Sequence, residues 1–543
     1  MSDDAKTSQL DAITAGYAFE GPSITLGAAL DDDGTAVPEA TVRLPLGSMN
    51  RHGLVAGATG TGKTVTLQVM AEQLSAAGVP VFLADIKGDL SGLATPAAEH
   101  EKIAARMQAL GQDWTGTAYP VEFLSLGGQG TGVPIRATIT AFGPLLLSKV
   151  LGLNATQESS LGLVFHYADK NGLALLDLKD LQAVIKHLLS DEGKADLKGL
   201  GGLSSSTAGV ILRQLIAFSD QGAEDFFGEP EFDTADLLRV REDGTGVITC
   251  LELPGVRDKP VVFSTFLMWL LADLFQDLPE VGDPEKPKLV FFFDEAHLLF
   301  DDASKAFLDS VEQAVRLIRS KGVGVFFVTQ TPKDVPDGVL GQLGNRVQHA
   351  LRAFTPEDAK ALRATVRTFP NSEYDLEEVL TQLGTGEAVI TVLSERGAPT
   401  PVARTMLRAP QARMGPSEEA LVQETVAGSE LAPKYAEPLD RESAYEKLTA
   451  GLAAAADEDG TPQVAGDPAG GSLEADLEKA GADGRWPEDE PAPARKGRAE
   501  PKEESLLEKV VDSGAFRSML RSAGTVIGRE VSRSILGTGR RRR

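Results

Sequence analysis

The sequence predicts an α/β protein with a mainly parallel sheet, and three observations support this prediction. Strand-like runs alternate with helix-like ones through most of the first four hundred residues, which is typical of a sheet covered by helices. Several of these runs are continuously apolar, as expected for strands buried on both faces. The glycine-rich segment GATGTGKT joins one such run to an amphipathic helical stretch. The expected strands are 52–57, 79–85, 119–126, 246–253, 288–295, 322–330, 346–354 and 387–393.

Changes in composition divide the chain into six expected parts. Between 141 and 240 leucines recur at helical spacing without a strand-like run, which indicates a helical insert. From about 451 to 505 the chain is mostly alanine, glycine, proline and acidic residues, which is typical of a disordered linker. The expected parts are a strand-bearing lead-in at 1–45, the α/β core at 46–140 and 241–416, the helical insert at 141–240, an acidic low-complexity linker at 417–504 and an amphipathic C-terminal helix with a basic tip at 505–543. That helix fits a docking segment, and it also fits a contact with nucleic acid or an anionic surface.

Charge and cysteine content limit the partners and the compartment. The 79 acidic residues outnumber the 53 basic ones, which gives a net charge of -26, so the chain as a whole is not attracted to phosphate polymers. The single cysteine, Cys250, excludes an intramolecular disulfide framework, and its apolar surroundings indicate a core thiol in a reducing compartment. The longest apolar runs are shorter than the roughly 20 residues of a membrane span, so we expect a cytoplasmic protein.

The segment from Gly57 to Thr64 has the spacing of a P-loop, and its setting between a strand and a helix makes the pattern specific. Its glycines let the backbone wrap closely around phosphate oxygens, and its N–H groups supply a positive cradle. Lys63 is expected to reach the β- and γ-phosphates of ATP, and the Thr64 hydroxyl is expected to bind Mg²⁺. The expected nucleotide-binding residues of the loop are Gly57, Ala58, Thr59, Gly60, Thr61, Gly62, Lys63 and Thr64.

An acidic pair follows the apolar run LVFFF and supplies the second half of such a site. Asp294 is expected to hold Mg²⁺ through its water shell, and Glu295 to act as the general base that polarises the attacking water. Two acids at this position also fit the cap of a helix. Because the P-loop is present, we favour the catalytic interpretation.

A polar residue, Gln330, ends the next apolar run, GVGVFFVTQ. It is expected beside the γ-phosphate, where it would sense the phosphate or orient water, although a strand-end glutamine facing solvent fits the same pattern. The order of P-loop, acidic pair and glutamine indicates the class of P-loop proteins with an extra strand between the two that carry the site. GTP is disfavoured because no guanine signature of the NKxD type follows.

Several charged residues are candidates for supporting roles. Asp85, which we expect at the nucleotide, is followed by Lys87 and Asp89 just after the second strand, where ligands of open α/β sheets collect. The same three residues also fit an ordinary turn that has no contact with the nucleotide. Four arginines could supply a charge to the γ-phosphate of a neighbouring subunit, which suggests an oligomer, or could form surface ion pairs. They are Arg316, Arg319, Arg346 and Arg352, of which Arg319 and Arg346 are our preferred catalytic candidates.

Taken together, these motifs resemble the bacterial HerA-like ATPases of the YjgR type, which are related to the HerA/FtsK superfamily of DNA-pumping motors. The resemblance covers about residues 20 to 416 and returns in GREVSRSILG near the end. The matching segments are 50–68, 79–94, 286–300, 328–336, 343–362 and 393–407. The resemblance implies a RecA-like ATPase core with the P-loop, acidic-pair and glutamine residues in the roles given above. It also implies a hexameric ring in which an arginine of the adjacent subunit acts on the nucleotide.

Two functions fit these observations. The first is an ATP-hydrolysing motor that moves duplex DNA, or another polymer, through a homo-oligomeric ring. The acidic net charge and the absence of a helix-turn-helix or zinc module weigh against DNA, although local basic residues in a pore are compatible with it. The second is a nucleotide-controlled assembly switch with slow hydrolysis and no nucleic-acid role, which a terminal helix on a tether favours. A small-molecule kinase is disfavoured because no phosphate-acceptor site is recognisable.

Overall fold

The computed structural model, which describes residues 3–198, 201–256, 259–282, 284–300 and 305–450, contains one sheet of 12 strands. Eight strands are joined by parallel pairings, and these are β3 (Gly53–Ala56), β4 (Val81–Asp85), β5 (Val121–Leu126), β6 (Val133–Ile135), β7 (Ile248–Glu252), β8 (Leu289–Phe293), β9 (Val323–Thr329) and β10 (Asn345–Gln348). Antiparallel pairings add β1 (Ser23–Leu30), β2 (Ala36–Pro45), β11 (Glu387–Thr391) and β12 (Ala403–Leu407) at one end. The order is β2-β1-β12-β11-β10-β3-β9-β8-β4-β7-β5-β6.

This sheet confirms the predicted α/β class with a mainly parallel sheet. Each of the eight expected strands is present, but the one expected at 346–354 ends at Gln348. β6 and β12 were not expected, because β6 has only three residues and β12 is buried only at alternate positions. A strand was expected somewhere in the lead-in, and the structure has the hairpin of β1 and β2 there.

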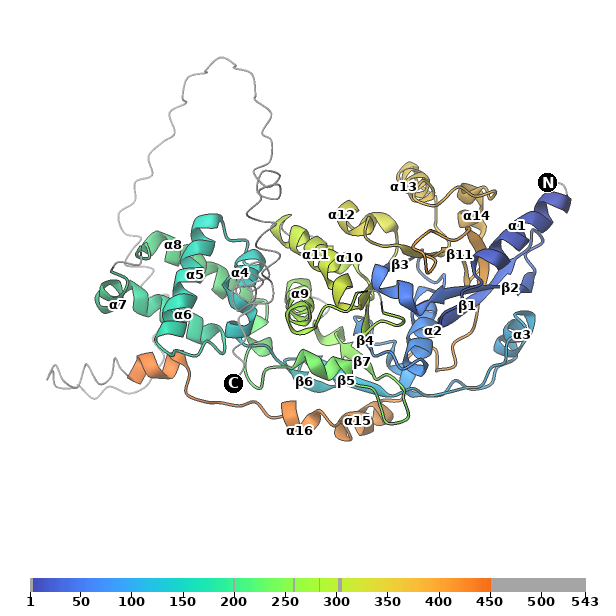
Figure 1. Cartoon of the computed structure of the whole chain (residues 1–543). Coiled ribbons are helices and arrows are strands. Elements are labelled where there is room, and N and C mark those ends of the chain that lie inside the picture. Colours follow the sequence, from blue (N-terminus) through green and yellow to red (C-terminus); the bar gives the residue numbers. More distant parts are fainter. Residues whose placement is uncertain (1–2, 199–200, 257–258, 283, 301–304, 451–543) are drawn as a thin grey trace, which may run out of the picture. The chain divides into compact units, whose positions relative to one another are not determined.

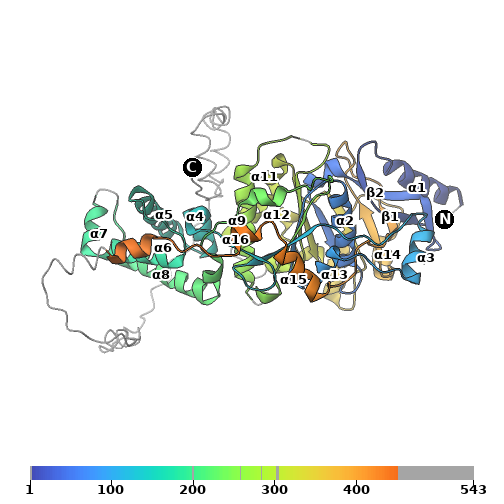
Figure 2. The same ribbon diagram turned by 90° about the horizontal axis from the view of Figure 1, so that it is seen from below.

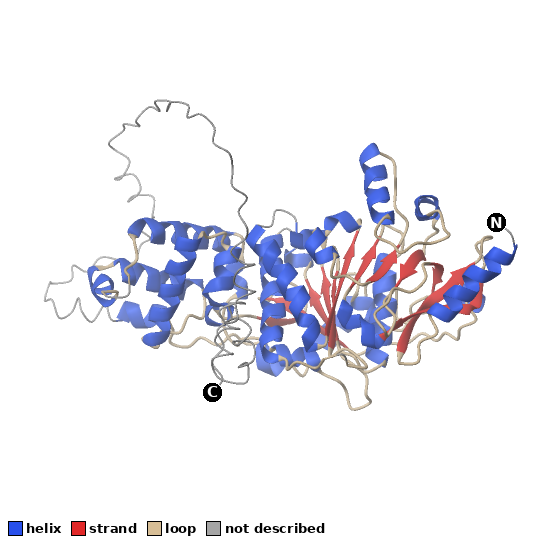
Figure 3. Ribbon diagram, turned by 45° about the horizontal axis from the view of Figure 1, so that its top comes forward, coloured by secondary structure: helices blue, strands red, loops and turns tan. Residues whose placement is uncertain are grey.

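Helices cover both faces of the sheet, as Figures 1 and 3 show. On one face α2 (Lys63–Ala76) packs Leu67 and Met70 into a core that includes Val55. On the other face lie α9 (Pro260–Asp277), α10 (His297–Phe300) and α11 (Lys305–Ile318). There the ring of Phe300 packs on that of Phe327 of β9, with 5.6 Å between the ring centroids. Among the described helices, none combines the length and the apolar content that crossing a bilayer requires.

The expected helical insert is present between β6 and β7. Its helices are α4 (Ile139–Val150), α5 (Ala155–Lys170), α6 (Leu178–Leu189), α7 (Asp191–Asp196) and α8 (Ser205–Asp220). Asn154 and Asp177 form capping boxes that start α5 and α6, because their side chains accept hydrogen bonds from first-turn N–H groups. Leucines and isoleucines on the inner faces of these helices are fully buried, which explains the helical spacing seen in the sequence.

The segment 417–450, where we expected the start of a linker, is folded instead. It carries α15 (Glu419–Ala427) and α16 (Ala432–Tyr435), both labelled in Figure 2. These helices contact β5 and β6, beside which Figure 1 draws them. Tyr435 anchors it: the side chain is fully buried, and the hydroxyl accepts from the N–H of Asp233 at 2.9 Å. A few well-placed apolar residues thus outweigh a polar composition. The expected linker from 451 and the C-terminal helix at 505–543 lie outside the described residues.

The remaining helices lie around the edges of the sheet. They are α1 (Asp3–Gly16), α3 (Glu101–Ala109), α12 (Asp337–Leu340), α13 (Pro356–Val366) and α14 (Leu376–Gln382). Leu362 of α13 and Leu380 of α14 form a separate small core with Val389 of β11. This core supports the segment between β10 and α13, which lies next to the P-loop.

Candidate active site

The glycine-rich loop lies at the carboxyl end of β3, between that strand and α2. Gly57 has no room for a side chain, because a Cβ there would lie 2.4 Å from the Cβ of His349. Gly60 and Gly62 have φ values of 80° and 113°, in the left-handed region that glycine tolerates best. No side chain caps the start of α2 at Lys63, so the N–H groups of its first turn are available to an anion.

The acidic pair follows β8 and is almost entirely buried. Asp294 is 2% exposed, and within the described residues neither of its carboxylate oxygens has a hydrogen-bond partner. Burial raises the pKa of Asp294 to about 6. Glu295 has a φ of 48°, a conformation that costs a non-glycine residue roughly 1–2 kcal/mol. Among the described residues neither carboxylate oxygen of Asp294 accepts a hydrogen bond that would mark it as a helix cap, so the catalytic interpretation stays the favoured one.

Lys63 lies at the same edge of the sheet as the acidic pair. Its Nζ donates to the carbonyl oxygens of Gly57 at 2.7 Å and Ala58 at 3.3 Å. Burial lowers the pKa of Lys63, and the nearby carboxylates of Glu295 and Asp294 oppose this change. The lysine is therefore within electrostatic range of both acids. The cause is topological, because β3, β9 and β8 are consecutive parallel strands and their carboxyl ends meet at one edge.

Gln330 follows β9, the strand between β3 and β8. Ala56 pairs with Thr329, and the N–H of Gly57 donates to the Thr329 carbonyl at 3.2 Å. This register puts the backbone of Gln330 beside the start of the P-loop. Its side chain is exposed, so the structure leaves it accessible to a ligand at this edge.

Asp85 holds the turn that follows β4. Its oxygens accept the backbone N–H groups of Lys87, Gly88 and Leu90 at 3.1, 2.7 and 2.8 Å, and the residue is fully buried. A carboxylate that accepts three backbone N–H groups stabilises a turn, which is the alternative that the sequence left open, and a nucleotide contact of Asp85 stays a prediction. What the turn presents to the site is Lys87, whose Nζ contacts Oε1 of Glu295.

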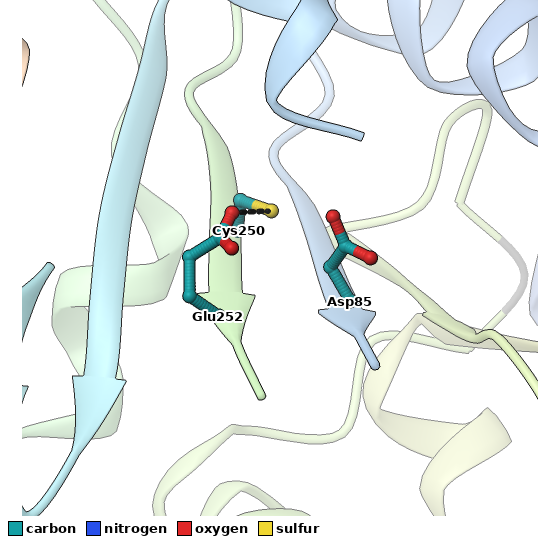
Figure 4. Close-up of side chains that lie close together, drawn as sticks. All are labelled: Asp85, Cys250 and Glu252. Atoms are coloured by element: carbon teal, nitrogen blue, oxygen red, sulfur yellow. Dashed lines mark hydrogen bonds between the residues drawn. The ribbon is translucent and has the colours of Figure 1, made fainter. Parts of the chain in front are cut away.

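Behind this turn, Asp85 meets two buried side chains of β7, Cys250 and Glu252 (Figure 4). The Sγ of Cys250 donates to Oε1 of Glu252 at 3.5 Å, and ligand atoms of the three residues lie within 4.8 Å of one another. Burial raises the pKa of the Cys250 thiol, which keeps it protonated, as expected for a core cysteine. Burial, with the neighbouring Asp85, also raises the pKa of Glu252 to about 7.

Replacing Glu252 with glutamine is expected to make the protein less sensitive to alkaline pH. The carboxyl holds its proton more tightly when folded, so its stabilisation is complete below its ordinary pKa of 4.5 and is lost as the pH rises through about 7. As the pH rises from 5 to 8, the wild type should therefore lose roughly 1–3 kcal/mol of unfolding free energy that Glu252→Gln keeps. Thermal unfolding midpoints at both pH values measure this. Glu242→Gln, at an exposed turn, is the control, and an equal pH response of the wild type and Glu252→Gln would contradict the prediction.

Three of the four arginines proposed from the sequence lie apart from the P-loop of their own chain. Arg316 pairs with Glu312 on the surface of α11. Arg319 lies near His52, whose pKa is lowered to about 4, first by burial and then by this guanidinium. His52 precedes β3, so Arg319 lies at the amino edge of the sheet, opposite the loop. Arg346 is half-buried on β10, level with Leu54, and burial lowers its pKa.

His349, Ala350 and Arg352 lie at the P-loop, and of these the sequence named only Arg352, as an arginine for a neighbouring subunit. The His349 ring lies with Nε2 2.9 Å from Oγ1 of Thr66, and the N–H of Ala58 donates to the carbonyl of Ala350 at 2.8 Å. Arg352, one of the four candidate arginines, reaches the carbonyl of Thr59 at 3.5 Å. These residues were read as part of a strand. The only signal against that interpretation was the run Thr355–Asp358, which contains a proline and follows Phe354.

Several curated relatives of this chain carry the name DNA double-strand break repair helicase HerA. It is 23% identical over 379 residues to the DNA double-strand break repair helicase HerA of Sulfurisphaera tokodaii, with 68% of this chain and 67% of the relative covered. It is 22% identical over 356 residues to the protein of the same name from Saccharolobus solfataricus, with 64% and 63% covered. The chain therefore spans about two thirds of the length of these relatives.

Solved structures and a family model complete the comparison. The chain is similar to the plasmid coupling protein TrwB in complex with a non-hydrolysable ATP analogue, with a TM-score of 0.48, 15% identity, and 73% of this chain and 97% of that chain covered. It is also similar to VirB4 of Thermoanaerobacter pseudethanolicus, with a TM-score of 0.43, 14% identity, and 74% and 99% covered. The family model for the helicase HerA-like C-terminal domain matches residues 32–543. The chain therefore belongs to the helicase HerA-like C-terminal family.

Proposed function

We propose that the chain hydrolyses ATP with Mg²⁺ and uses the energy to move duplex DNA through a homo-oligomeric ring. The observation that carries the ATPase part is the common edge at which Lys63 meets the acidic pair. A lysine in a P-loop and two carboxylates on a nearby strand are what a magnesium–triphosphate complex needs from a protein. Family membership supports a motor ATPase.

The residues fit the cofactor. In this proposal the N–H groups of the loop and of the first turn of α2 hold the phosphates, and Lys63 exchanges its loop carbonyls for phosphate oxygens. The Thr64 hydroxyl and the Asp294 carboxylate would hold Mg²⁺, and the buried oxygens of Asp294, which have no hydrogen-bond partner among the described residues, are suited to this. When bound, Mg²⁺ neutralises charge on the β- and γ-phosphates.

The chemical step falls to two further side chains. Glu295, whose backbone is held in a strained conformation beside Asp294, would accept the proton of the attacking water. Gln330, exposed at the end of the strand between, would orient that water and sense the γ-phosphate. An arginine from the neighbouring subunit, Arg319 or Arg346, would stabilise the charge that develops in the transition state. Because neither lies at the P-loop of its own chain, this part of the proposal requires an oligomer, for which we propose a hexamer.

The relatives' names support a DNA substrate, since they describe DNA double-strand break repair helicases. Segments such as VTQTPKDVP and LSERGAPTPVARTML support placing the chain in the YjgR-type branch of the family. The buried free thiol of Cys250 supports a reducing, cytoplasmic compartment. The net charge of -26 means that any DNA contact must rest on a local cluster of basic residues.

Duplex DNA is expected to raise the ATPase rate severalfold at low salt. Because phosphate contacts release counterions, the logarithm of the binding constant should fall linearly with the logarithm of the salt concentration, with a slope of about 0.9 per contacted phosphate. The measurement is the steady-state ATPase rate with and without duplex, together with duplex binding at several salt concentrations. If the duplex neither binds nor stimulates an active ATPase, the DNA part fails, and the nucleotide-controlled assembly switch becomes the better description.

A further inference from the structure

Lys87 reaches the acidic pair because β4 and β8 are neighbouring parallel strands. Ala84 pairs with Phe293, so the residues that follow the two strands run side by side. The turn after β4 is fixed by Asp85, whose carboxylate accepts the backbone N–H of Lys87 itself. The position of Lys87 opposite the acidic pair is therefore built into the register of the sheet and into one buried side chain.

The Lys87 ammonium contacts both acids. Its Nζ forms an ion pair with Oε1 of Glu295 and lies 3.7 Å from Oδ2 of Asp294. The two acids are nearly buried, with 11% and 1% of their side-chain surface exposed. Two adjacent buried carboxylates repel each other unless a cation is near. Lys87 supplies such a cation, at the carboxylates that the proposed function assigns to Mg²⁺ and to the attacking water.

We propose that Lys87 is the resting counter-ion of the acidic pair, and that it must leave Asp294 and Glu295 when the magnesium–nucleotide complex binds. The proposal rests on the proposed ATPase function. A divalent cation held by Asp294 would be repelled by an ammonium beside the same carboxylate, so the two compete for the site. While the ion pair lasts, Oε1 of Glu295 is also engaged, and the adjacent ammonium makes this carboxylate a weaker base towards water. Lys87 is thus a positioning residue that keeps the site inactive until the complex arrives.

Lysine is suited to this role. Its side chain is 34% exposed, so a path to solvent is open to the ammonium. The flexible four-carbon stem can swing away without moving the turn, because Asp85 holds the backbone and not the side chain. The same turn would return the ammonium to the acids after the product leaves.

The test measures how much Mg²⁺ the full-length protein needs in order to bind a fluorescent non-hydrolysable ATP analogue. In Lys87→Met the stem is kept and the charge is removed, so the half-saturating Mg²⁺ concentration should fall about tenfold. Lys87→Arg keeps the charge and should stay within about twofold of the wild type. Lys194→Met removes an ion-paired lysine of the helical insert and should change nothing. Lys87→Gln serves as the second neutral variant if Lys87→Met does not fold.

The outcomes show whether Lys87 competes with Mg²⁺, and separately whether the proposed ATPase function holds. The proposal is supported if the neutral variants need less Mg²⁺ than the wild type while Lys87→Arg and Lys194→Met need about as much. An unchanged or higher requirement in the neutral variants overturns it, because Lys87 then does not compete with the cation. If the wild type binds the analogue without any need for Mg²⁺, or does not bind it, the proposed function itself fails. Wild-type binding that depends on Mg²⁺ therefore separates the two claims.

Discussion

Replacing Lys63 with alanine is expected to lower the rate of ATP hydrolysis by at least about a hundredfold, the loss typical of removing one preorganised charge from a transition state. The ammonium lies within electrostatic range of Asp294 and Glu295 at the edge where the γ-phosphate would bind. Without it, the negative charge that spreads over the phosphate oxygens in the transition state would lose its nearest protein cation. The measurement is phosphate release at saturating Mg²⁺ and ATP, with the circular dichroism spectrum as a check on folding.

The fold should survive this change. Within the described part of the chain, Lys63 donates to the carbonyls of Gly57 and Ala58, which water can solvate once the side chain is shortened. Lys194→Ala, in the helical insert, provides a control with an equal change of charge and should retain wild-type turnover. Turnover at the wild-type rate in folded Lys63→Ala would mean that the loop is not the hydrolytic site, and the proposed function would have to be abandoned.

The sheet was predictable because its central strands are apolar throughout. Runs such as Leu289–Phe293 and Val323–Thr329 are buried at every position, and a sequence records such burial directly. The edge strands carry a weaker signal. β2 is buried at only some of its positions, and the segment around Tyr435 is held by a few anchors in an otherwise polar stretch. A composition-based boundary at 417 therefore came too early.

Some residues of the candidate site were likewise predictable from local patterns, and others were not. The P-loop, Asp294, Glu295 and Gln330 are local patterns at strand ends, and the parallel order of β3, β9 and β8 brings them to one edge. What the pattern could not show is which way a side chain turns. Asp85 reads as a ligand but is occupied by three backbone N–H groups, whereas Lys87, two residues later, reaches the acids. These outcomes depend on the turn geometry and on which strand lies next to β8, and neither is written in a local motif.

Replacing Glu295 with glutamine is expected to reduce turnover by about 10²–10⁴-fold while nucleotide binding persists. An amide of the same shape cannot accept the proton of the attacking water, but Lys63 and Asp294, which we assign to the phosphates and Mg²⁺, are unchanged. The variant should therefore bind the fluorescent analogue with the Mg²⁺ dependence of the wild type or at a lower Mg²⁺ concentration, because its contact with the Lys87 ammonium is weakened. Analogue binding and single-turnover hydrolysis measure the two effects separately.

Asp294→Asn is the comparison that separates cation binding from proton acceptance. If Asp294 holds the cation, that variant should lose the Mg²⁺ dependence of analogue binding, whereas Glu295→Gln should keep it. Equal loss of binding in both variants would show that the two carboxylates act as one cation site, and no general base could then be assigned to Glu295. Retained hydrolysis in Glu295→Gln would point instead to a base elsewhere at this edge. His297, whose Nδ1 lies 3.2 Å from Oε2 of Glu295, would then be the first residue to replace.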